Sequence, residues 1–171
     1  MTSPRLIICG ADTIDEYRHH EITHILTIAT PGATAIRPDW FAGKQLVLYF
    51  GDVVSEADAI QCKTLAPTPA DINQAVAFTA QAWSVDTATV LIHCDYGASR
   101  SPAVAYVALA HKLGAGAEAQ ALQIIEEIRP EAVPNKMVVQ IGDDLLGRNG
   151  ALLAQLDKMY AAINEEISFL M

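Results

Sequence analysis

The sequence predicts an α/β domain with a mainly parallel central sheet of about four or five strands, flanked by helices, and a helical C-terminal half. Two observations carry this prediction. Short β-branched runs alternate with helical segments up to Cys94, as is typical of parallel sheets. Beyond that residue, apolar side chains recur at helical spacing. The 171 residues suit a single domain, residues 1–171, with a full-sized core and no linker.

Four apolar runs are the predicted strands, each ending near a turn residue or a polar loop. The first is short, and the others are rich in β-branched or aliphatic side chains. They cover Arg5–Cys9, Thr23–Thr30, Gln45–Phe50 and Thr89–His93. Between the third and fourth runs, residues 51–67 are expected to form a loop of mixed character before the next helix.

Capping residues mark where the predicted helices begin. Asp12 and Thr13 are both candidate caps for a short helix ending at His20. Thr68 precedes Pro69, and Asp71 occupies the capping-box position, so this segment predicts a well-defined helix start. The remaining predicted helices span residues 100–113, 118–128, 134–147 and 151–167.

An apolar stripe runs along the last of these helices. Its members recur at helical spacing and are Leu152, Leu156, Met159, Ile163 and Ile167. Packing against the domain's own core is the simpler interpretation, and an oligomer interface is the alternative. The oligomeric state is therefore left open by the sequence.

The balance of charge restricts the partners. Eleven basic and 20 acidic side chains give a formal net charge of −9, which disfavours nucleic acid and anionic membranes. Asp12 interrupts the first apolar run too early for a secretory signal, and no apolar stretch is long enough to span a membrane. Three cysteines, Cys9, Cys62 and Cys94, form no metal-like cluster. We therefore expect a cytoplasmic protein with free thiols and neither metal nor cofactor.

The segment TVLIHCDYGASRSP, residues 89–102, is the strongest functional signal. Its strand ends at Cys94, a short loop follows, and Arg100 opens a helix. Unpaired N–H groups and the dipole at a helix N-terminus favour an anion, and Arg100 adds a permanent positive charge. These features favour the thiolate form of Cys94, which is the nucleophilic form.

The same features suit a phosphate group. Successive N–H groups of a loop that enters a helix form an anion-binding nest, and the guanidinium of Arg100 can bind two phosphate oxygens at once. In-line attack by Cys94 would give a cysteinyl-phosphate that water hydrolyses, without a metal. The alternative is a buried structural cysteine with Arg100 on the surface. Gly97, Ser99 and Ser101 all agree with one anion site and favour the functional interpretation.

The run His93–Ser101, HCDYGASRS, resembles the active-site loop of cysteine-based protein phosphatases. Its Gly and Ser-Arg-Ser pattern is most similar to dual-specificity phosphatases and small bacterial tyrosine-phosphatase-like proteins. A weaker similarity covers about residues 23–147 and includes the segment from Arg129-Pro130 to Pro134-Asn135. The resemblance implies a protein tyrosine phosphatase-like fold with that range as catalytic region and 151–167 as an additional amphipathic helix.

The resemblance also implies roles for individual residues. Cys94 would be the nucleophile, and Arg100 would clamp the phosphate. Ser101 would supply the hydroxyl that helps the cysteine leave, and His93 would tune the thiolate and order the loop. The phosphate oxygens would bind to the backbone amides of Asp95, Tyr96, Gly97, Ala98, Ser99 and Arg100.

Departure of the leaving group requires a proton donor, which in this family is an aspartate on a separate loop. Asp52 directly follows the strand Gln45–Phe50. Because loops after parallel strands share one edge of a sheet, Asp52 is the expected general acid. Asp58 and Glu56 lie in the same loop and are the alternatives, as is a solvated acidic loop with no catalytic role.

The side chains at the variable positions of the loop limit the class of substrate that we expect. Phosphoinositide and RNA phosphatases with such a loop tend to carry lysines in it, whereas this chain has Asp95, Tyr96 and Ala98. The expected substrate is a phosphorylated protein, most naturally on tyrosine, or a small phosphomonoester. Phosphate or sulfate is expected to occupy the loop. Tyrosine-only and dual specificity stay open, and a pseudophosphatase that binds phosphate without turnover is the alternative function.

Overall fold

Four parallel strands form the centre of the molecule. The computed structural model describes residues 5–170. Its strands are β1 (Arg5–Gly10), β2 (His24–Ala29), β3 (Lys44–Tyr49) and β4 (Thr89–Cys94), in the order β1-β4-β2-β3. All three neighbouring pairs are parallel. The predicted α/β class with a parallel sheet is confirmed, and the carboxyl ends of all four strands lie at one edge.

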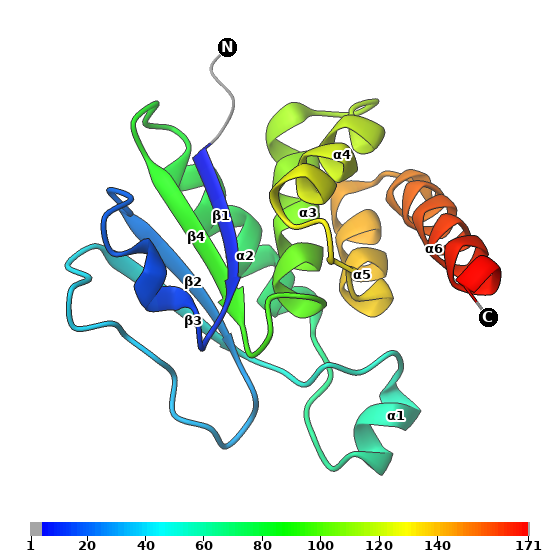
Figure 1. Cartoon of the computed structure of the whole chain (residues 1–171), viewed down its shortest axis with the longest axis horizontal. Helices are drawn as coiled ribbons and strands as arrows, with labels where there is room; N and C mark the ends of the chain where they lie inside the picture. The colour runs from blue at the N-terminus through cyan, green and yellow to red at the C-terminus, as the bar shows by residue number, and fades with distance from the viewer. Residues whose placement is uncertain (1–4, 171) are drawn as a thin grey trace.

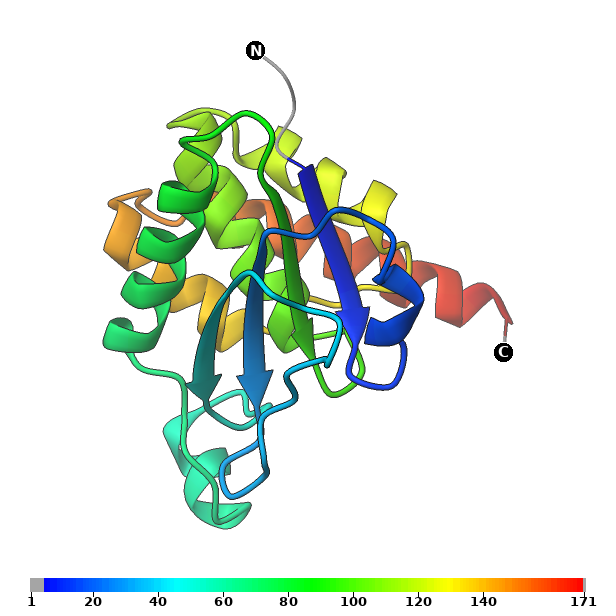
Figure 2. The same cartoon turned by 90° about the vertical axis from the view of Figure 1, so that its left-hand side faces the viewer.

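The long helices pack on one face of this sheet, as Figures 1 and 2 show. They are α2 (Pro69–Ala82), α3 (Arg100–Leu113), α4 (Glu118–Ile128), α5 (Lys136–Leu146) and α6 (Ala151–Leu170). The other face is covered by a smaller apolar cluster in which Ile14 and Phe41 pack against Ile25 and Leu91. The helical C-terminal half therefore lies on a single side of the sheet.

Helix α3 is the centre of the packing. Every residue from Arg100 to Ala110 is buried, because α3 contacts the sheet as well as α2, α4 and α5. Tyr106 is fully buried, and its hydroxyl donates a hydrogen bond to the carbonyl of Leu152 at 3.2 Å. Since α3 begins at the end of the HCDYGASRS loop, the core itself fixes the position of that loop.

Two short elements differ from the prediction. The segment 51–67 is not only loop, because it contains the helix α1 (Glu56–Gln61), which Ser55 caps by accepting from the amide of Asp58 at 3.1 Å. This helix is too short to produce a helical periodicity in the sequence. The helix expected from Asp12 or Thr13 to His20 is reduced to the single 3₁₀ turn η1 (Ile14–Tyr17). The capping box of Thr68 and Asp71 is present as predicted.

The stripe on α6 packs on the domain's own core along its first half. Leu152, Leu156 and Met159 are buried, whereas Ile167 is 51% exposed. Helix α6 contacts α4 and α5. The core-packing interpretation is thus confirmed for the beginning of the stripe. Among residues 5–170, no helix is both long and apolar enough to cross a membrane.

The close approach of α3 and α5 gives a prediction for stability. A Cβ added at Gly142 would lie 2.3 Å and 2.6 Å from the two methyl groups of buried Val107. We expect Gly142→Ala to lower the free energy of unfolding by about 1–2 kcal/mol, since overpacking outweighs the gain in helix propensity. Urea unfolding followed by circular dichroism measures this change.

The control experiment removes the two methyl groups of Val107. In a Val107→Ala background, Gly142→Ala should be much less destabilising, because both methyl groups are gone and only the Cβ of residue 107, 3.0 Å from the added Cβ, still has to shift. Equal destabilisation in both backgrounds would contradict this packing.

Candidate active site

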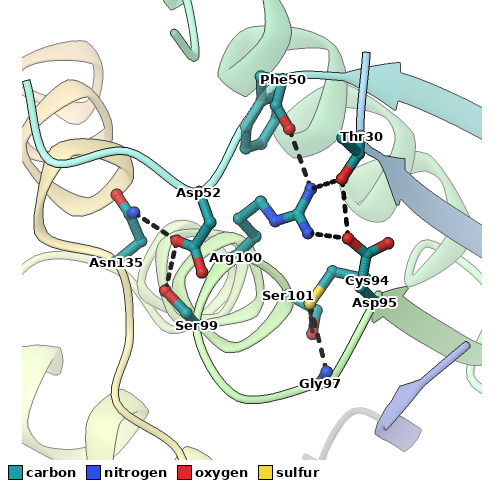
Figure 3. Close-up of polar contacts among 10 residues, drawn as sticks. All are labelled: Thr30, Phe50, Asp52, Cys94, Asp95, Gly97, Ser99, Arg100, Ser101 and Asn135. Atoms are coloured by element: carbon teal, nitrogen blue, oxygen red, sulfur yellow. Dashed lines mark hydrogen bonds and ion pairs between the residues drawn. The ribbon is translucent and has the colours of Figure 1, made fainter. Parts of the chain in front are cut away.

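The HCDYGASRS loop lies at the carboxyl edge of the sheet, between the end of β4 and the start of α3 (Figure 3). Gly97 has a φ of +71°, and a Cβ there would lie 2.5 Å from the backbone carbonyl carbon of Cys9. The amide of Ala11 also donates to the carbonyl of Asp95 at 3.0 Å. The loop is therefore pressed against the end of β1, and only glycine fits at its closest point.

The sulfur of Cys94 lies inside the loop with two polar neighbours. The N–H of Gly97 donates to Sγ at 3.3 Å, and Oγ of Ser101 lies 3.2 Å from Sγ. Both Cys94 and Ser101 are buried. A backbone N–H donor and a hydroxyl within hydrogen-bond distance can both stabilise an anionic sulfur. The structure thus brings together the predicted nucleophile and the predicted hydroxyl.

The backbone of the loop directs its carbonyl groups outward. The carbonyl of Tyr96 accepts from Arg129 at 3.2 Å, that of Ala98 from the amide of Val133 at 2.7 Å, and that of Ser99 from the amide of Asn135 at 3.1 Å. Within the described residues, the N–H groups of Tyr96, Ala98 and Ser99 donate to no protein group. Free N–H groups on neighbouring residues of one loop, next to the Gly97 N–H that points at the sulfur, are the geometry of an anion-binding nest.

Arg100 is buried at the first turn of α3, with only 4% of its side chain exposed. Its Nη1 donates to the carbonyl of Phe50 at 3.0 Å and to Oγ1 of Thr30 at 3.2 Å. Its Nη2 donates to Oδ2 of Asp95 at 2.6 Å. Its Nε is buried and has no hydrogen-bond partner among residues 5–170. A buried donor without a partner costs about 1–3 kcal/mol, so the site is suited to receive an acceptor.

His93 orders the end of β4 and does not bond to the sulfur. Its ring is buried, and Nε2 lies 2.8 Å from Oγ1 of Thr27, which also accepts from Gln45 at 2.8 Å. Burial lowers the pKa of His93 to about 4, and the Cys94 backbone and Asp95 offset this only in part. The ring is therefore neutral at neutral pH. It orients the strand end and adds no positive charge to the site.

Of the three candidate acids, Asp52 lies beside the loop. Its Oδ1 accepts from Oγ of Ser99 at 2.7 Å and from Nδ2 of Asn135 at 2.8 Å (Figure 3). Asn135 also donates to the carbonyl of Val53 at 3.0 Å. These contacts hold the carboxylate against the start of α3, while Oδ2 makes no hydrogen bond with the described residues.

Asp58 lies elsewhere in its own segment. Its carboxylate accepts from the amide of Val54 at 3.0 Å and from Sγ of Cys62 at 3.5 Å, so it belongs to the start of α1. Glu56 is in the first turn of the same helix. The geometry therefore favours Asp52 over both alternatives.

Solved structures resemble the fold of this chain, although no family model and no curated protein matches it. Human DUSP28 is 20% identical with a TM-score of 0.66, and the match covers 90% of this chain and 96% of that chain. The Yvh1 phosphatase domain from Chaetomium thermophilum is 21% identical with a TM-score of 0.64, covering 88% and 95%. The chain has the dual-specificity phosphatase fold. The fold implied by the HCDYGASRS resemblance is confirmed.

Within this phosphatase fold, several site partners were not identified from the sequence. Thr30 and the carbonyl of Phe50 hold Arg100, while Ser99 and Asn135 hold Asp52. Asn135 lies in the turn that carried part of the resemblance, which was the only local signal for it. Thr30 had no such signal, because it is an ordinary residue at the end of a strand.

The other two cysteines, Cys9 and Cys62, lie outside the HCDYGASRS loop. Cys9 is buried in the cluster on the opposite face of the sheet, and burial raises its pKa to about 12. Cys62 is exposed at the end of α1, where it donates to Asp58. All three thiols are free.

The neutral ring of His93 predicts a pH-dependent stability. Its pKa in the folded chain is about 4, below the ordinary 6.5. Between these values the unfolded chain binds a proton that the folded chain does not, so stability is lost as pH falls from 6.5 to 4. The loss due to His93 is up to about 3 kcal/mol.

Urea unfolding at pH 7 and pH 4.5 measures this effect. His93→Gln should show a smaller decrease than the wild type over this interval, whatever its stability at pH 7. An equal decrease in both proteins would contradict the burial of a neutral His93.

Proposed function

We propose that the protein is a metal-independent phosphomonoester hydrolase that forms a cysteinyl-phosphate, acting as a protein tyrosine or dual-specificity phosphatase. One observation carries the proposal. The sulfur of Cys94 lies in a loop with free N–H groups, beside a buried Arg100 whose Nε has no partner among the described residues. A nucleophile and an oxyanion cradle therefore share one turn of the chain.

In the first step, the thiolate of Cys94 attacks phosphorus in line with the leaving oxygen. The S–P bond forms as the P–O bond breaks, and Asp52 gives a proton to the departing oxygen from its free Oδ2. The loop N–H groups and Arg100 stabilise the charge on the equatorial oxygens, which is the main requirement of phosphoryl transfer.

In the second step, water attacks the cysteinyl-phosphate and Asp52 accepts a proton from it. The S–P bond breaks, and the hydroxyl of Ser101, 3.2 Å from Sγ, stabilises the departing sulfur. The products are inorganic phosphate and the regenerated thiolate of Cys94. No group outside the chain is required for either step.

The substrate that fits best is a single phosphate on an aromatic or small alcohol of a cytoplasmic protein or metabolite. One structural neighbour is a mouse putative dual specificity phosphatase complexed with zinc tungstate, and another is PTPMT1 in complex with PI(5)P. The present loop has no lysine and carries Asp95, which disfavours multiply charged lipids. Tyr96, within the loop, is 80% exposed and can stack on a phosphotyrosine ring.

A phosphate-binding module without turnover is the second candidate. It is favoured by the likeness to human tyrosine phosphatase-like serine/threonine/tyrosine-interacting protein, which is 21% identical with a TM-score of 0.59 over 80% of this chain and 83% of that chain. Cys94, Arg100 and Ser101 are all present, and Oγ of Ser101 lies 3.2 Å from the sulfur of Cys94. Their presence supports the enzyme.

Hydrolysis of p-nitrophenyl phosphate in the presence of EDTA tests the nucleophile and the clamp. Cys94→Ser should reduce hydrolysis to background, because a serine hydroxyl at this position has no base to activate it. Arg100→Lys should lower kcat/KM by about a hundredfold or more, since lysine cannot bind two oxygens in a planar fork.

The matched control is Cys62→Ser, which changes an exposed thiol on α1 and should leave the rate unchanged. A wild type that binds vanadate but hydrolyses nothing between pH 5 and 8 would establish the binding module instead.

A comparison of leaving groups tests the acid. Asp52→Asn should lower kcat by about 10²–10⁴ for phenyl phosphate. The loss should be much smaller for p-nitrophenyl phosphate, whose leaving group departs without a proton. Asp58→Asn, an equivalent change on the same segment, should affect neither substrate. If Asp58→Asn shows the selective loss and Asp52→Asn does not, the assignment of Asp52 is wrong.

A further inference from the structure

Only some of the N–H donors of the Arg100 guanidinium make hydrogen bonds with the described residues. A guanidinium has five N–H donors, and three of them bond to Phe50, Thr30 and Asp95. The remaining two are the Nε–H and the second N–H of Nη2. These two donors lie on the same side-on edge of the planar group, which is the edge that can bind two oxygens of one phosphate.

The opposite, end-on edge is closed by a short network. Oγ1 of Thr30 accepts from Nη1 at 3.2 Å and donates its own proton to Oδ2 of Asp95 at 2.7 Å. The same Oδ2 accepts from Nη2 at 2.6 Å. Thr30, Asp95 and the Nη1/Nη2 edge thus form a closed ring of three contacts, visible in Figure 3.

We propose that Asp95 is a positioning residue. Together with Thr30, its carboxylate holds the end-on edge of Arg100 and so presents the Nε/Nη2 edge to a bound phosphate. This inference rests on the proposed function, because it assigns a role to the Asp95 side chain within that site. The resemblance of the loop implies only that the backbone N–H of Asp95 binds phosphate, and assigns nothing to its carboxylate.

The ionisation of Asp95 agrees with this role. Burial raises the pKa of its carboxyl, but hydrogen bonds from Thr30 and Arg100, together with the charge of Arg100, outweigh burial and lower the pKa below its ordinary value. The group is therefore a carboxylate at neutral pH. Hydrogen bonds between ionised partners are about twice as strong as neutral ones, so the carboxylate can keep the guanidinium in one orientation.

The opposite role for Asp95 would be that of an internal competitor which occupies Arg100 in place of phosphate. The count of donors argues against it. Asp95 uses one hydrogen of Nη2, and Nε has no partner within residues 5–170. Two donors on one edge of the guanidinium therefore stay available for phosphate while Asp95 is bonded to Nη2. The two roles predict opposite signs when the side chain is removed.

The experiment compares Asp95→Ala, Asp95→Asn and Thr30→Val with wild type. The readouts are kcat and KM for p-nitrophenyl phosphate and the binding constant for orthovanadate. Asp95→Ala should lower kcat by about tenfold to a hundredfold and weaken vanadate binding by about tenfold, because Arg100 is no longer oriented. Asp95→Asn keeps an acceptor and should recover most of both, and Thr30→Val should show a smaller loss of the same kind.

Asp86→Ala is the control for removal of one negative charge, since Asp86 is exposed between α2 and β4. Near-ultraviolet circular dichroism confirms that each variant is folded. Unchanged or tighter vanadate binding by Asp95→Ala would overturn the positioning role and favour the competitor. Losses in Asp95→Asn as large as in Asp95→Ala, with Thr30→Val unaffected, would also overturn it.

A failure of the proposed function has a different signature. If the wild type binds vanadate but hydrolyses no substrate, the proposed enzymatic function is wrong. The role of Asp95 is then decided by the vanadate affinities of the variants alone. A wild type that binds no vanadate overturns both.

Discussion

The structure depends on one buried cation at the beginning of a buried helix. Burial of a charge is costly unless it is paired, and a cation at a helix N-terminus also opposes the helix dipole. Arg100 is stabilised there by groups that follow three different strands, namely Thr30 after β2, Phe50 after β3 and Asp95 after β4. Because these strands end at the same edge of the parallel sheet, the three groups meet around the guanidinium. An anion in the loop would provide an acceptor for its remaining donors.

The helical half of the chain takes part in the same site through a second set of contacts. The segment between α4 and α5 donates to the outward carbonyls of the loop. From that segment, Asn135 also holds Asp52 and the carbonyl of Val53. The loop is thus fixed between the sheet on one side and the helices on the other. Its free N–H groups are a result of packing, since the carbonyls are turned away by their partners.

The acidic composition and the anion site are compatible because they act over different distances. The net charge of −9 is spread over the chain and is screened beyond about 10 Å at ordinary salt. Inside the loop, the N–H groups and Arg100 act at hydrogen-bond distance. Asp95 and Asp52 add two carboxylates next to this cradle. Under the proposed function, such surroundings suit one phosphate group and disfavour a cluster of them.

The sequence alone determined the parallel sheet, the main helices, the Thr68 capping box and the placement of Cys94 and Arg100 on one strand-loop-helix turn. These features depend on periodicity, capping and a strand-loop-helix turn, which lie within contiguous stretches of chain. Only the tertiary structure showed that Asp52 lies against the loop while Asp58, from the same segment, belongs to the start of α1. It alone identified Thr30 and Asn135, which bond to residues 70 and 83 positions away. Partners so distant in sequence leave no local pattern, because the sheet edge, and not the order of residues, brings them together.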